Sequence, residues 1–77
     1  MKLVPIEPKK LIKVLGQIGY VPVRQKGSHV ILENKEKRKI TVVPVHAGKD
    51  IGVGLLSRIL NEVGLSKEEY FKILDSI

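Results

Sequence analysis

Apolar positions along the chain follow two periods, and the first segment has the period of a helix. Pro8 suits the first turn of a helix, where a missing N–H costs nothing. Apolar residues then recur at positions 11, 12, 15 and 18, with lysine and glutamine on the other side. Gly19 is a natural helix stop. We therefore predict an amphipathic helix over residues 8–18.

The next segment alternates with period two, which is typical of a strand. Residues 20–26 place their valines on one face and the cations Arg24 and Lys26 on the opposite face. Pro22 lies within this segment and cannot donate a hydrogen bond to a neighbouring strand. We therefore expect an edge strand or a bulge at this position.

Two more strands follow, over residues 29–33 and 39–43, and tight polar turns connect all three. His29 lies at the start of the first of these two strands. In the other, Ile40 and Val42 are expected to face the core. The sequence thus predicts a three-stranded antiparallel sheet.

The C-terminal third returns to helical spacing. Apolar residues at positions 55, 56, 59, 60 and 63 make the strongest helical stripe in the chain, and Gly64 ends it. Ser66 and Glu69 fit a capping box, which predicts a short third helix. The predicted fold is α+β in the order α-β-β-β-α-α, one domain over residues 1–77, with the first two helices on one face of the sheet and water on the other.

The charge of the chain favours polyanionic partners. There are 14 Lys and Arg against 8 Asp and Glu, a net charge of +6. Residues 24–39 hold six cations and two carboxylates, whereas residues 62–77 hold two cations and four carboxylates. The basic surface therefore belongs to the middle of the chain, and nucleic acid is a better candidate partner than a membrane.

Several classes of protein do not fit the composition. The chain has no cysteine, so disulfides, thiolate metal sites and cysteine nucleophiles are excluded. No apolar run approaches the roughly 20 residues of a membrane-spanning helix, and the N-terminus lacks the apolar core of a signal peptide. We expect a soluble, cytoplasmic protein with no membrane partner.

One histidine in the middle of the chain lies beside two cations. Residues 23–29 (VRQKGSH) place His29 at the start of the second strand. Because side chains alternate between the two faces of a strand, Arg24 and Lys26 are expected on one exposed surface, with Lys39 nearby. RNA carries its own nucleophile, the 2′-hydroxyl, so its cleavage needs a base, an acid and cations for the phosphate, and a histidine titrates in the useful range. The alternative is a half-exposed strand histidine with no chemical role.

The loop after the third strand holds the only other histidine. His46 is free to serve as a second acid or base, with loop packing or substrate contact as the alternatives. Two histidines cannot hold a metal without carboxylates, and no ligand spacing is evident, so we expect neither a metal nor another cofactor. Residues 48–54 (GKDIGVG) are not a nucleotide-binding loop, because Asp50 stands where Ser or Thr is required. Lys49 remains a candidate phosphate contact beside the start of the next helix.

Taken together, these segments resemble the HicA toxin family. The resemblance spans nearly the whole chain, and the run RQKGSH is its most specific part. Its segments are residues 23–29 (VRQKGSH), residues 43–46 (VPVH) with Gly48 and Lys49, residues 55–60 (LLSRIL) and residues 64–66 (GLS).

The resemblance implies a fold like that of a double-stranded-RNA-binding domain, cleavage of mRNA without a metal, and neutralisation by a HicB-type antitoxin. The family's catalytic histidine follows a Gly-Ser pair and maps onto His29. Many relatives carry a second histidine directly after it, but this chain has Val30 there, so that auxiliary role is absent. The predicted RNA contacts are Arg24, Lys26, Gly27, Ser28, Lys39 and Lys49, with His46 as a candidate auxiliary group.

Two other functions stay open. In a non-catalytic double-stranded-RNA-binding module, the same basic hairpin would hold phosphates without cutting. A dense lysine cluster at the start of the last helix would favour that module, and here Lys49 stands nearly alone. A protein-interaction domain of decayed toxin ancestry is the third interpretation, against which the intact Gly27, Ser28 and His29 argue.

Overall fold

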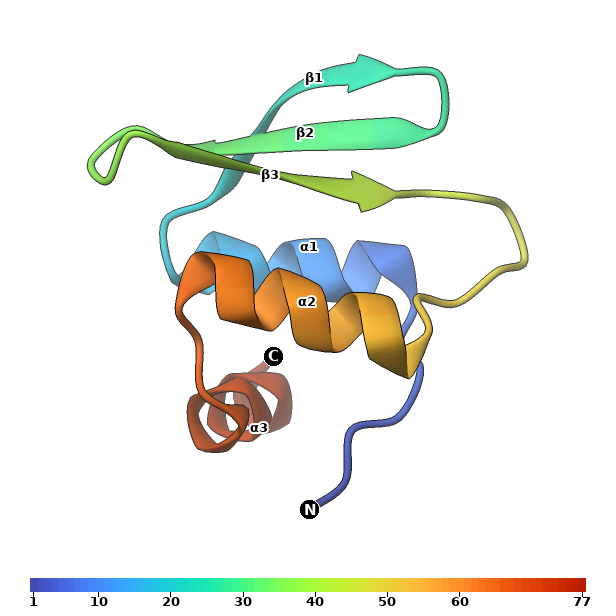
Figure 1. Ribbon diagram of the computed structural model, residues 1–77, viewed down its shortest axis with the longest axis vertical. Coiled ribbons are helices and arrows are strands. Elements are labelled where there is room, and N and C mark those ends of the chain that lie inside the picture. The colour runs from blue at the N-terminus through green and yellow to red at the C-terminus, as the bar shows by residue number, and fades with distance from the viewer.

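Three helices and one sheet make up the molecule. The computed structural model describes residues 1–77. The two helices that flank the strands in sequence lie on the same side of the sheet, and the last helix lies beyond them (Figure 1). The predicted α+β order α-β-β-β-α-α is confirmed. The elements are α1 (Pro8–Gln17), β1 (Val21–Lys26), β2 (His29–Asn34), β3 (Lys39–Pro44), α2 (Val53–Val63) and α3 (Lys67–Ser76).

Local sequence signals account for where the helices begin and end. Pro8 occupies the first position of α1, and Gly64 ends α2 in the left-handed conformation with φ +73°. At the start of α3, the Ser66 hydroxyl accepts the Glu69 N–H at 3.2 Å, and the Glu69 carboxylate accepts the Ser66 N–H at 3.4 Å. The predicted capping box is therefore present.

A buried asparagine ties the end of α1 to the turn between β2 and β3. The Asn34 side chain is 4% exposed; its Nδ2 donates to the Ile18 carbonyl at 3.1 Å and its Oδ1 accepts the Lys37 N–H at 3.0 Å. Gly19, with φ +94°, leaves room for it, because a Cβ there would lie 3.0 Å from Asn34 Nδ2. Gly19 thus serves both as the helix stop and as space for this contact.

The register of β3 against β2 decides which residues of β3 reach the core. Thr41 and Val43 pair with buried residues of β2 and are themselves 3% and 0% exposed. The prediction that Ile40 and Val42 face the core is wrong: they are 65% and 39% exposed on the outer face. Apolar residues occur at both odd and even positions of this strand, so its own sequence allows either set of side chains to face the core. Only the pairing with β2 decides which set is buried.

The strand β1 is an edge strand with an irregularity at its proline. It lies at one side of the sheet order β1-β2-β3, and its register shifts between Pro22 and Arg24. The expectation of an edge strand or bulge is confirmed. The extra residue inverts the alternation, so Arg24 and Lys26 share the outer face with Val21. The prediction that they lie opposite Val21 is therefore wrong.

One apolar core lies between the sheet and the helices. It comprises 15 buried residues contributed by all three helices, two strands and the segments between them. The N-terminal segment is held by two backbone hydrogen bonds, from the Ile6 N–H to the Ile51 carbonyl at 3.1 Å and the reverse at 2.7 Å. No helix has the length and apolar character needed to cross a membrane.

Candidate active site

The two histidines lie together at one end of the sheet. The turn between β1 and β2 and the loop after β3 reach the same end (Figure 1). His29 opens β2, and its ring centroid lies 6.4 Å from that of His46, with the ring planes at 80°. Both side chains are exposed. The fold thus joins two residues that are 17 positions apart into one pair of accessible imidazoles.

Ser28 connects the turn to the loop. Its hydroxyl oxygen lies 3.4 Å from His46 Nε2, and its carbonyl accepts the Val45 N–H. Farther along the loop, the Lys49 N–H donates to the His46 carbonyl at 3.1 Å. These contacts hold the start of the loop, and His46 with it, against the β1–β2 turn.

The turn itself requires a glycine. Gly27 has φ +61°, in the left-handed region that costs other residues about 1–2 kcal/mol. The Gln25 side chain amide donates to the Gly27 carbonyl at 3.1 Å across the turn. Gly27 and Ser28 therefore set the direction from which His29 leaves the turn.

Two of the predicted cations lie on the same face as His29. Lys26 pairs directly with His29 across the β1–β2 ladder, and Arg24 pairs with Ile31, the next residue of that face. Both cations are exposed. Lys49 lies in the loop with His46, and the two line a hollow of about 380 Å³ between this loop and the start of α1. We call Lys26, Ser28, His29 and His46 the histidine end.

Lys39 does not belong to this group. It pairs with Asn34, five residues along β2 from His29, which is about 17 Å at the rise of a strand. The prediction that Lys39 lies near His29 is wrong. Lys39 is the first residue of β3, whereas His29 pairs with the last residue of that strand, Pro44. Lys39 instead borders α2, near Arg58 and Glu62.

The arrangement at the histidine end suits proton transfer to and from a bound anion. An imidazole is the side chain that gains and loses a proton most readily near neutral pH, and Lys26 supplies a positive charge beside one of them. No group of three or more His, Asp or Glu side chains lies close enough to hold a metal ion. The two imidazoles of this end belong to His29 and His46.

Comparison with known proteins adds the family. The model for the HicA toxin of bacterial toxin–antitoxin systems matches residues 8–65. The chain belongs to the HicA toxin family. The match in this HicA-family chain runs from the first residue of α1 through Leu65 and so includes the whole histidine end, whereas α3 lies outside it. No curated protein sequence matches closely.

The contact between Ser28 and His46 in this HicA-family protein was not predicted from the sequence. Ser28 was expected as a turn residue and an RNA contact, and no local pattern connects it with a residue 18 positions away. The side chains of Arg58 and Glu62 were not predicted as a site either, although their spacing of four residues places them on one face of a helix.

Proposed function

We propose that this HicA-family toxin is an endoribonuclease that cleaves mRNA with His29 as a general acid or base. Its substrate carries the attacking group, the 2′-hydroxyl. His29 removes that proton or donates one to the departing 5′-oxygen, and Lys26 and Arg24 neutralise the phosphate between them. Membership of a toxin family and the net charge of +6 support this function.

The observation that carries the proposal is the approach of His46 to His29. Cleavage by way of the 2′-hydroxyl moves two protons, one from the nucleophile and one to the leaving group. Two imidazoles with ring centroids 6.4 Å apart are close enough for both to reach one phosphodiester. We therefore assign His46 as the partner acid or base, and Ser28 as the residue that positions it.

The proposed partner is a HicB-type antitoxin that neutralises the toxin in the cytoplasm by covering the histidine end. Acidic or apolar groups over Lys26 and His29 would keep RNA away from the imidazoles. In a purified complex, His29 should be protected from histidine-modifying reagents and RNA cleavage should stop. A stable complex in which His29 is still modified at the free rate would contradict neutralisation by occlusion.

The test of the function is incubation of a defined RNA with purified protein in the presence of a metal chelator. The parent and a Lys72→Ala variant should cleave the RNA, and His29→Ala should leave it intact. Lys72 is an exposed cation on α3, outside the matched region, so it controls for loss of charge. Intact RNA with a mobility shift in all lanes would indicate the non-catalytic RNA-binding module instead.

A further inference from the structure

The outer edge of β3 is an open row of backbone hydrogen-bonding groups. β3 ends the sheet order, so only β2 pairs with it. The Val45 N–H donates to the Ser28 carbonyl, in the same register as the β2–β3 pairing. In an antiparallel pair every second residue turns its N–H and C=O toward the neighbouring strand. Counting back from Val45, the residues of β3 that bond to β2 are Val43, Thr41 and Lys39. The N–H and C=O groups of Ile40 and Val42 therefore point away from the sheet.

The two edges of the sheet differ in how far they resist a further strand. β1 carries Pro22 and a register shift, both of which discourage strand addition. β3 pairs with β2 without a shift along its whole length, and its only proline is the last residue, Pro44. The edge of β3 is thus the one regular and unprotected edge.

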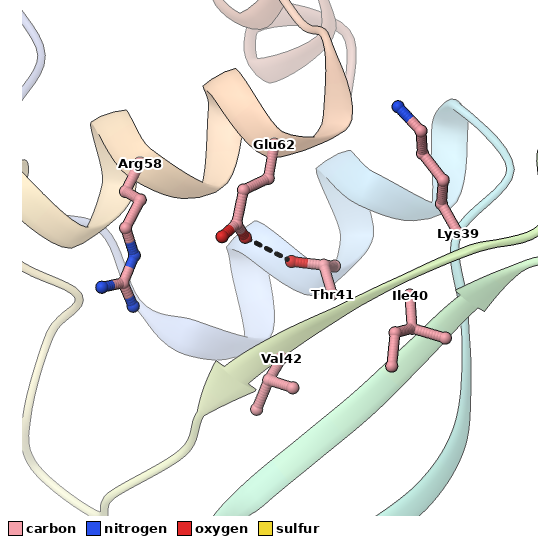
Figure 2. Close-up of a pocket in the computed structure, with 6 residues that line it drawn as sticks. All are labelled: Lys39, Ile40, Thr41, Val42, Arg58 and Glu62. Atoms are coloured by element: carbon pink, nitrogen blue, oxygen red, sulfur yellow. Dashed lines mark hydrogen bonds between the residues drawn. The ribbon is translucent and has the colours of Figure 1, made fainter.

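A groove runs beside that edge. It has a volume of about 500 Å³ and is lined by four consecutive residues of β3 and two residues of α2. Figure 2 shows Glu62 between Arg58 and Lys39, with its carboxylate directed toward Thr41. The Thr41 hydroxyl donates to Glu62 Oε1 at 3.4 Å, which satisfies a side chain that is 3% exposed. We call this the β3 groove: Lys39, Ile40, Thr41, Val42, Arg58 and Glu62.

The geometry points to an acidic, extended segment of a partner protein that adds to β3 as a fourth strand. Its backbone would bond to the free groups of Ile40 and Val42, as in other cases of strand addition. Alternate side chains of the added strand would face α2, where Lys39 and Arg58 favour Asp or Glu. The remaining side chains would lie beside Ile40 and Val42 on the outer face, which favours valine or isoleucine. The preferred segment therefore alternates acidic and β-branched residues.

Other occupants fit the groove less well. RNA cannot form the ladder of backbone hydrogen bonds that an open strand edge offers. A second copy of this chain would bring two molecules of net charge +6 together. A partner segment with acidic side chains supplies that ladder and carries the charge opposite to Lys39 and Arg58, which together outnumber the single carboxylate of Glu62. This site extends along β3 from Lys39 to Val42, contains no residue of the histidine end and does not depend on the proposed cleavage.

The test is an NMR titration of the full-length, ¹⁵N-labelled protein with a short synthetic peptide of alternating valine and aspartate. The amide signals of Ile40 and Val42 should shift and exchange more slowly with solvent. Val42→Pro removes one free N–H without removing a bond to β2, so it should weaken binding at least tenfold. The matched variant Val42→Ala keeps that N–H and should stay within about threefold of the parent, a range typical of one lost side-chain contact.

Arg58→Ala keeps the proposal testable if the proline variant does not fold, because Arg58 is exposed on α2. It should weaken binding at least fivefold, and a peptide with lysine in place of aspartate should not bind. The proposal is overturned if Ile40 and Val42 do not shift in excess peptide, or if the lysine peptide binds equally well. It is also overturned if an RNA oligonucleotide displaces the peptide, or if the same amides shift on concentrating the protein alone.

Discussion

Both ends of the sheet carry positive charge, but the groups beside that charge differ. At the histidine end, Lys26 pairs with His29, and the exposed imidazole of His29 lies 6.4 Å from that of His46, centroid to centroid. In the β3 groove, Lys39 and Arg58 lie beside a carboxylate and an open strand edge. Positive charge attracts an anionic partner to either end, whereas the neighbouring groups decide whether a reaction or only binding follows.

The strongest test of this difference removes the acid–base group from the histidine end. His29→Ala should lower kcat/KM for RNA cleavage about 10²–10⁴-fold, the usual effect of losing a general acid or base. It should leave the thermal midpoint nearly unchanged, because the side chain is exposed. Initial cleavage rates and circular dichroism check the two statements. Equal cleavage rates for His29→Ala and the parent would remove His29 from the mechanism.

His46 provides a second, smaller test at the same end. We expect His46→Ala to lower kcat about 10–100-fold, since one of the two proton transfers would pass to water. His46→Gln distinguishes chemistry from positioning, because an amide can still meet the Ser28 hydroxyl but cannot transfer a proton at neutral pH. Single-turnover rates should be low for both variants. Recovery of the parent rate in His46→Gln would show that His46 only positions the loop.

The two hairpin turns allow the same comparison in terms of stability. Gly27 at the histidine end and Arg38 at the opposite end both have positive φ, +61° and +55°. Gly27→Ala should destabilise the protein by about 1 kcal/mol, while Arg38→Gly should stabilise it by up to about 1 kcal/mol. Urea denaturation measures both free energies of unfolding. The same sign of change for the two variants would contradict the assigned turn geometry.

The smallest expected effect concerns single lysines in RNA binding. In a His29→Ala background, which prevents cleavage, Lys26→Ala should weaken binding a few-fold and reduce the salt dependence of log K by about one. Lys39→Ala removes the same charge about 17 Å away along the sheet and should do less. Fluorescence anisotropy at several salt concentrations compares them, with Lys72→Ala as the control. Equal losses at Lys26 and Lys39 would mean that bound RNA spans both ends of the sheet.

The order and the ends of the elements were determined by the sequence itself. Pro8, Gly64 and the Ser66 capping box act within one turn of the helices that they begin or end, so their effect does not wait for distant contacts. The irregular pairing at Pro22 follows from the missing N–H of proline, which is a property of that residue alone. His29 as the candidate catalytic group also came from the sequence, through the run RQKGSH.

Only the tertiary structure decided the relations between distant segments. The phase of β3, which buries Thr41 and exposes Ile40, depends on its register against β2. The same register sends Lys39 to the far end of the sheet and brings the loop after β3 to Ser28, so that His46 approaches His29. In a strand with apolar residues at both odd and even positions, the local sequence does not determine which side chains are buried. Pairing with a neighbouring strand determines it.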